Sequence, residues 1–296
     1  MQIEEVAEKT YRLETPVPGT GLIFSVYLID SDRGVLIEPG PSAAIPSIRE
    51  GMKQAGMKEL SWIIPTHIHM DHGGGTGTLA EAFPQARVIA HPLSARHIID
   101  PARLIQSTRM TYGEDFETIY GPIIPVPESR VKVPDDGETI SVGDRELQII
   151  YAPGHAPHHI AIFDQKTGGL FCGEALGMET ADPLPAAAAP SFNMEDCLET
   201  MRRLKSLHPK LLCYSHGGVK LNPETRISQV MKNTLFYNEL ILESLNNDES
   251  AHEISRKVIE HACDQFPPEW EEDMIRVWQT GIIDGYTIYL KNKGLA

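Results

Sequence analysis

Three histidines and an aspartate lie close together in one short stretch of the sequence. They are His67, His69, Asp71 and His72, and three consecutive glycines at 73–75 follow them. His67 and His69 are two positions apart, so an extended backbone would project both side chains to the same side, whereas Asp71 and His72 can face a second point. Neutral imidazole suits zinc, iron and copper, and a carboxylate adds charge to such a site. The stretch predicts a metal site, because a polar loop that is rich in histidine by chance explains so dense a cluster poorly.

Three more residues of ligand type occur later in the chain, each just past a short apolar run. They are His155, Glu174 and His216. Each alone would be weak evidence, because a single histidine after a strand is more often structural. Functional side chains favour the ends of strands, where loops vary while the strands hold them rigidly. If the apolar runs form neighbouring strands, these residues converge with His67 and His69 on one edge of a layered sheet structure.

Hydrophobic runs, alternation and turn residues indicate the elements that must position this site. In the first half, strands are expected at 6–13, 21–29, 34–38, 60–65 and 87–91, with helices at 45–56, at 78–83 and from 92 onward. In the second half, strands are expected at 139–142, 147–151, 160–163, 170–172 and 211–214, with a helix at 194–208. Residues 100–126 lack clean periodicity and either cap a pocket or pack on the surface. From about residue 223 onward the sequence is mostly helical in pattern.

Length and composition are those of an ordinary globular protein. The chain has 296 residues, of which 41% are hydrophobic and 23% charged, enough for one large domain or two modest ones. No apolar run approaches the length of a transmembrane helix, the acidic N-terminus lacks the layout of a signal peptide, and the four scattered cysteines form no Cys-x-x-Cys pair. These features predict a cytoplasmic protein without a membrane partner. The formal net charge of −15 repels polyphosphate backbones, so a nucleic-acid partner is not expected.

The motif His-x-His-x-Asp-His after a buried strand resembles the metallo-β-lactamase superfamily. The resemblance covers about residues 6–218 and implies an α+β fold, the αββα four-layer sandwich in which two β-sheets lie between helices. It predicts a metal-binding domain at 1–220 and a helical C-terminal extension at 221–296 packed on it.

The resemblance also implies a ligand set for two divalent metal ions, zinc first, with iron or manganese as alternatives. His67, His69 and His155 would hold one ion, and Asp71, His72 and His216 the other. Glu174 stands where the family normally has a bridging aspartate. Because glutamate is one methylene longer, the sequence leaves open whether Glu174 bridges two ions or whether the site is mononuclear.

Three further residues near these ligands could support them. Glu38 occupies a position where the family usually has an aspartate that supports the first metal-binding loop. His158 and His159 follow His155 closely. His159 is expected either to orient a ligand loop or to pack at the start of the next strand.

The function implied by the resemblance is that of a metallohydrolase. Two divalent ions ~3.5–4 Å apart can share a metal-bound hydroxide at neutral pH, and Asp71 would be the catalytic residue that orients the hydroxide or carries a proton. The expected substrate is a small-molecule ester, lactone, thioester, amide or phosphoester. One alternative is an iron-containing redox protein that handles oxygen or persulfides, and another is a non-catalytic metal-binding sensor. The sequence is also compatible with a homo-oligomer.

Overall fold

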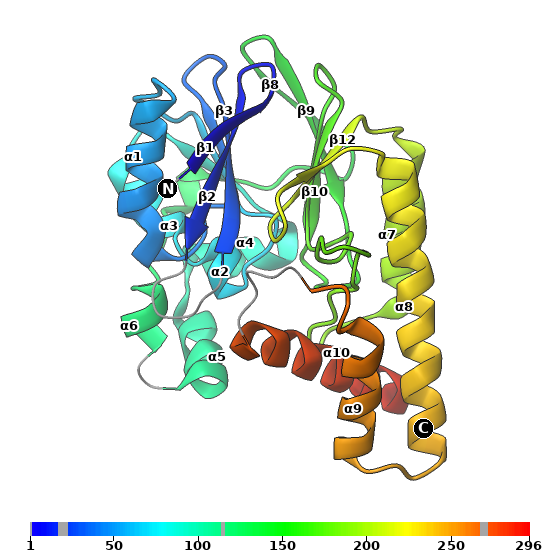
Figure 1. The fold of residues 1–296 in the computed structure, drawn as a ribbon. Helices are drawn as coiled ribbons and strands as arrows, with labels where there is room; N and C mark the ends of the chain where they lie inside the picture. Colours follow the sequence, from blue (N-terminus) through cyan, green and yellow to red (C-terminus); the bar gives the residue numbers. More distant parts are fainter. Residues whose placement is uncertain (1, 17–22, 114–115, 267–271) are drawn as a thin grey trace.

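The computed structural model describes residues 2–16, 23–113, 116–266 and 272–296, and its centre is a pair of β-sheets packed face to face (Figure 1). The first sheet contains, in spatial order, β1 (Gln2–Ala7), β2 (Thr10–Pro16), β3 (Ile23–Ile29), β4 (Val35–Ile37), β5 (Trp62–Ile64), β6 (Arg87–Ile89) and β7 (Val131–Lys132). The second contains β13 (Val219–Lys220), β12 (Leu211–Tyr214), β11 (Gly169–Gly173), β10 (Ile160–Asp164), β9 (Arg145–Tyr151) and β8 (Thr139–Val142).

Neighbouring strands of the first sheet are antiparallel from β1 to β4 and parallel from β4 to β7. In the second sheet the pair β11–β12 is parallel and the other pairs are antiparallel. The parallel strands β4 and β5 both end toward the loops that carry Glu38 and the His-x-His motif. The sheet order therefore brings residues far apart in sequence to one edge.

Helices cover the outer face of each sheet. The first sheet is covered by α1 (Ile45–Gln54), α3 (Thr76–Ala82) and α4 (Pro92–Ile99), and the second by α7 (Met194–Ser206) and α8 (Pro223–Asn246). One apolar core lies between the sheets, with Tyr27, Ile64 and Phe171 among its buried side chains, and two further cores lie beneath the helices. This is the predicted αββα four-layer sandwich, and the α+β fold class is confirmed.

The described residues after β13 form three helices, α8, α9 (Ala251–Ala262) and α10 (Glu272–Asn292). Their buried side chains, such as Ile227, Val258 and Tyr286, belong to the same core as α7 and the second sheet. The division into domains at 1–220 and 221–296 stays a prediction. Among the described residues, no helix is both long enough and apolar enough to span a membrane.

The structure corrects one expected element and shows two helices in a segment where the sequence indicated none. The single strand expected at 6–13 is a hairpin of β1 and β2, because the chain turns at Lys9, which has a φ of +49°. The aperiodic residues 100–126 contain the helices α5 (Ala102–Tyr112) and α6 (Phe116–Tyr120). Residues 21 and 22 of one expected strand lie outside the described part of the chain.

Candidate metal centre

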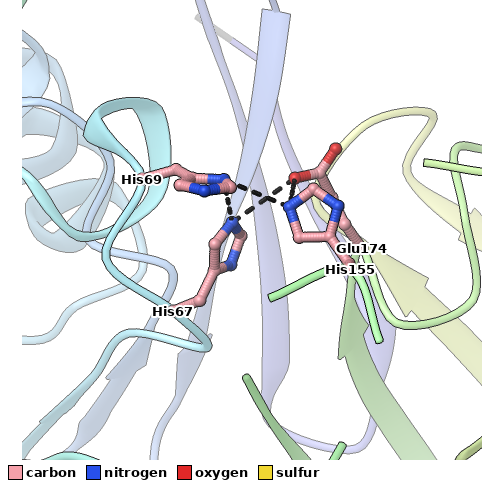
Figure 2. A group of neighbouring side chains, drawn as sticks. All are labelled: His67, His69, His155 and Glu174. Carbon is pink, nitrogen blue, oxygen red and sulfur yellow. Dashed lines mark hydrogen bonds and ion pairs between the residues drawn. The ribbon is translucent and has the colours of Figure 1, made fainter. Parts of the chain in front are cut away.

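The first group of ligand-type side chains joins His67 and His69 to His155 and Glu174. His69 Nδ1 lies 3.0 Å from His67 Nε2 and 3.1 Å from His155 Nε2. Glu174 Oε2 lies 3.0 Å from His155 Nε2 and 3.4 Å from His67 Nε2. Figure 2 shows the four side chains converging, two from the loop after β5 and two from the loops that follow β9 and β11.

Hydrogen bonds on the far side of these rings leave unprotonated nitrogens facing the centre. His155 Nδ1 lies 3.1 Å from the carbonyl oxygen of Ala186, which can only accept, so Nδ1 carries a proton, and in the neutral ring Nε2 is bare. The Thr66 hydroxyl donates to Glu38 at 2.5 Å and therefore accepts from His67 Nδ1 at 3.1 Å, which leaves His67 Nε2 bare as well. Bare acceptors this close together are suited to a cation, because ligands bound at 2.0–2.2 Å around a tetrahedral ion lie about 3.3–3.6 Å apart.

The second group contains Asp71, His72 and His216. Asp71 Oδ2 lies 3.4 Å from both His72 Nε2 and His216 Nε2. His216 Nδ1 donates to the Ile23 carbonyl at 3.1 Å, and His72 Nδ1 lies 3.1 Å from Glu38 Oε2. His72 Nε2 is buried and has no hydrogen-bond partner among the described residues. A cation beside Asp71 would account for this buried nitrogen.

Glu174 connects the two groups. Its Oε2 atom, besides contacting His67 and His155, lies 3.3 Å from His72 Nε2. One carboxylate oxygen is thus within reach of ring nitrogens from both groups, which is the position of a bridging ligand.

The backbone before Glu174 is held in place by His159. His159 Nε2 accepts a hydrogen bond of 3.1 Å from the Glu174 N–H. Gly173 has a φ of +55°, and a Cβ atom there would lie 2.5 Å from His159 Nε2 and 2.6 Å from Thr66 Oγ1. The position therefore requires glycine, and His159 orients a ligand loop, one of the two roles expected for it.

Glu38 supports the centre from the side of the first sheet. Its carboxylate is buried and accepts from the hydroxyls of Thr66 and Ser215 at 2.5 and 2.8 Å, while its other oxygen faces His72. Thr66 precedes His67 and Ser215 precedes His216, so one carboxylate ties together the two segments that deliver ligands. This agrees with the supporting role expected for Glu38.

The environment of the first group favours the protonation states that bind metals. Burial and neighbouring imidazoles lower the pKa of His69 to about 3 and the pKa of His67 well below its ordinary value. Burial alone would raise the pKa of the Glu174 and Asp71 carboxyls, but the attraction of His155 and His72, respectively, holds both pKa values well below normal. Neutral imidazoles and charged carboxylates are the forms that coordinate a cation. In the second group burial alone would lower the pKa of His72 and His216, but the Asp71 carboxylate raises both pKa values, so a cation bound there would displace a proton.

The family model described as the metallo-beta-lactamase superfamily matches residues 19–216, a span that contains every residue of both groups. The chain belongs to the metallo-beta-lactamase superfamily.

Individual relatives in the metallo-beta-lactamase superfamily are distant. The uncharacterized protein YobT of Bacillus subtilis is 29% identical over 218 residues, which cover 70% of this chain and 88% of YobT. A hydroxyacylglutathione hydrolase of Legionella pneumophila is 29% identical over 148 residues, which cover 50% of this chain and 45% of that enzyme. Among solved structures, the archaeal superfamily protein ST1585 of Sulfolobus tokodaii aligns with a TM-score of 0.70 at 20% identity, over 96% of this chain and 99% of its own. The shared fold therefore includes most of the helical extension.

All seven residues predicted as ligands of a metallo-beta-lactamase-like centre come together in these two groups, and their role as ligands stays a prediction. His158 joins neither group, since its ring centroid lies 6.2 Å from that of His69 and 6.3 Å from that of His67. Sequence reasoning missed the carbonyls of Ala186 and Ile23, which fix two imidazoles. Every residue has a backbone carbonyl, so the sequence cannot show which carbonyls accept these hydrogen bonds, and only the fold identifies them.

Proposed function

We propose that this chain is a metal-dependent hydrolase of a small-molecule ester, lactone, thioester, amide or phosphoester. The observation that carries the proposal is the position of Glu174 Oε2, within 3.4 Å of ring nitrogens from both ligand groups. Two adjacent cation positions that share a carboxylate suit attack on an electrophilic carbonyl or phosphorus. Similarity to a hydroxyacylglutathione hydrolase supports hydrolysis and includes a thioester among the classes to be tested.

The donor set is suited to zinc, because neutral imidazoles with one or two carboxylates are common zinc ligands. In this proposal His67, His69 and His155 hold one ion, Asp71, His72 and His216 hold the other, and Glu174 contacts both. The bound ions would lower the pKa of water from 15.7 toward ~7 and polarise the oxygen that gains charge.

Asp71 is the residue we propose for proton handling. Its side chain keeps 19% of its surface exposed, whereas those of His72 and His216 keep 1% and 4%. Asp71 Oδ2 faces the two imidazoles, and the exposed part of the carboxylate can meet a substrate or a water molecule. Asp71 would orient the attacking group and accept its proton.

The test uses the full chain, stripped of metal and reloaded with Zn²⁺, against a panel with one chromogenic substrate of each of the five classes. We expect turnover of at least one class, lost on chelation and restored by Zn²⁺. The variant Asp71→Asn should lower kcat/KM by about 10²-fold or more, while Asp248→Asn, which changes an exposed carboxylate, should not. Two bound ions with no turnover of any class would contradict the proposal.

Iron-based redox chemistry is a second candidate, and Glu174 is the observation that favours it. A carboxylate among imidazoles, with no cysteine in either group, also suits iron. The two candidates differ in the metal retained by protein purified without added metal. Coloured protein with one or two iron ions, which loses them in Glu174→Asp, would favour redox chemistry, and colourless zinc protein would favour hydrolysis.

A further inference from the structure

We propose that the C-terminal helix α10 positions the imidazole of His155, so that docking of α10 and metal binding at the first ligand group are coupled. Helix α10 lies below the two sheets, at the same end of the sandwich as α2 (Met70–Gly73) (Figure 1). It falls outside residues 19–216, the part that the family model matches. The inference rests on metal binding but not on hydrolysis, and goes beyond the proposed function.

The contact between the helix and the ligand runs through the segment from Pro185 to Ala187. The carbonyl of Ala186, in the middle of this segment, accepts the hydrogen bond from His155 Nδ1 at 3.1 Å. This bond sets both the rotation of the ring and the proton position, and therefore the direction of the bare Nε2 nitrogen. Loss of a hydrogen-bond partner that orients a ligand imidazole in this way typically lowers metal affinity by about 10–100-fold.

Helix α10 holds the residues on both sides of Ala186. Trp278 Nε1 donates to the Pro185 carbonyl at 3.1 Å. Gly281 and Gly285, one helical turn apart and hence on one face, both face Ala187. A Cβ atom at Gly281 would lie 2.9 Å from the Ala187 oxygen, and one at Gly285 would lie 2.8 Å from the Ala187 Cβ. Helix α10 therefore packs so closely against Ala187 that a side chain at position 281 or 285 would collide with it.

The helix is itself firmly attached to the rest of the fold. Tyr286 is buried, packs its ring 4.6 Å from that of Phe192 and donates from its hydroxyl to the Thr234 carbonyl in α8 at 2.9 Å. From α8, Asn233 Nδ2 also donates to the Pro183 carbonyl at 2.8 Å. The segment that carries Ala186 is thus held from both helices, and a shift of α10 would displace the acceptor of His155.

The second ligand group has different supports. His216 Nδ1 bonds to the Ile23 carbonyl in β3 and His72 Nδ1 faces Glu38, which follows β4. Both partners belong to the first sheet and its loops. A change in α10 should therefore weaken one ion selectively, and by linkage the binding of that ion should stabilise the docked helix by the same free energy.

The first experiment titrates Zn²⁺ against a competing chelator, using the metal-stripped full chain. In Gly285→Ala, and in Trp278→Phe, which removes the N–H donor, we expect one of two binding constants to weaken by roughly 10-fold and the other to change less than about 2-fold. Alanine favours a helix over glycine by about 0.5–1 kcal/mol, so loss of helix cannot explain a weaker constant in Gly285→Ala. The control is Val277→Ala, since Val277 lies on α10 and is 65% exposed.

The second experiment measures amide hydrogen exchange along α10 with and without Zn²⁺. We expect Zn²⁺ to slow exchange in the wild type and in His216→Ala, but not in His155→Ala, although His155→Ala keeps the second ligand group. Equal slowing in His155→Ala and His216→Ala would overturn the coupling. So would unchanged or equally weakened constants in the α10 variants, or a wild-type chain that binds no Zn²⁺.

Discussion

Glu38 and Glu174 face opposite nitrogens of one imidazole, that of His72. Glu38 Oε2 lies 3.1 Å from Nδ1, and Glu174 Oε2 lies 3.3 Å from Nε2. By the family resemblance, aspartate is the residue expected at both positions. Two glutamates, each one methylene longer than aspartate, thus contact the same ring from its two sides. His72 is contacted both by the supporting carboxylate, Glu38, and by the ligand carboxylate, Glu174.

Replacing Glu38 tests the supporting side of this arrangement. In Glu38→Gln the hydroxyls of Thr66 and Ser215 and the N–H of His72 lose a charged acceptor. We expect unfolding in urea to become easier by about 1–3 kcal/mol and the ion of the second group to bind about 10–100-fold more weakly. The control is Glu81→Gln, at an exposed position in α3. Unchanged metal affinity in Glu38→Gln would show that His72 is oriented without its help.

Shortening Glu174 tests the ligand side. Its Oε2 atom contacts nitrogens of His67, His72 and His155 at 3.0–3.4 Å, and a side chain one methylene shorter cannot keep all three contacts at the same backbone position. We expect Glu174→Asp to retain one ion and to bind the other at least about 10-fold more weakly, as measured by elemental analysis after dialysis. Full retention of both ions would mean that the backbone at Gly173 moves to compensate.

A buried ion pair far from the metal centre should affect the stability of the fold but not metal binding. Arg145 Nη1 lies 2.6 Å from Asp164 Oδ2, both side chains are fully buried, and Arg145 also donates to the Glu8 carbonyl. Removing one partner leaves an uncompensated buried charge, so Arg145→Met or Asp164→Asn should each cost about 3–5 kcal/mol of unfolding free energy. The combination Arg145→Met with Asp164→Leu should recover part of that loss. Zn²⁺ stoichiometry should stay unchanged in every variant that folds.

Acid should weaken a surface ion cluster in a defined direction. The Lys166 ammonium lies 2.7 Å from Glu8 and 2.5 Å from Asp144, and its hydrogen bonds hold the pKa of both carboxyls below their ordinary values. A carboxyl with a lower pKa in the folded chain adds stability above its unfolded pKa, about 4, and loses that contribution as the pH falls further. The difference in Tm between wild type and Lys166→Met should therefore be present at pH 6 and shrink below about pH 4. A constant difference at every pH, or one insensitive to salt, would contradict this assignment.

The layered fold and the convergence of the seven ligand-type residues could be predicted because both can be recognised from residue types. Buried strands appear as apolar runs, and His155, Glu174 and His216 stand directly after such runs. The hairpin of β1 and β2 was missed because its turn, at Glu8 and Lys9, contains none of the glycine, asparagine or proline that usually signals a turn. Lys9 adopts a positive φ, which is not expected of a lysine from the sequence.

The backbone and helix contacts that support the centre could not be predicted. The hydrogen bond from His155 to Ala186 uses a backbone carbonyl, and the approach of Gly281 and Gly285 to Ala187 depends on how α10 docks. From the sequence alone these glycines only lower the expected stability of a helix, since glycine is unfavourable in helix interiors. Their role in the close packing of α10 against Ala187 is visible only in the folded structure.

The place of α10 in the chain also sets an order of events during synthesis. At roughly 5–20 residues per second, a ribosome needs on the order of ten seconds to pass from His155 to Gly281. All seven ligand side chains are made within residues 67–216, before the helix that we propose to orient one of them. A nascent chain would therefore hold its first ion loosely and exchange it freely, and would retain that ion firmly only once α10 has docked.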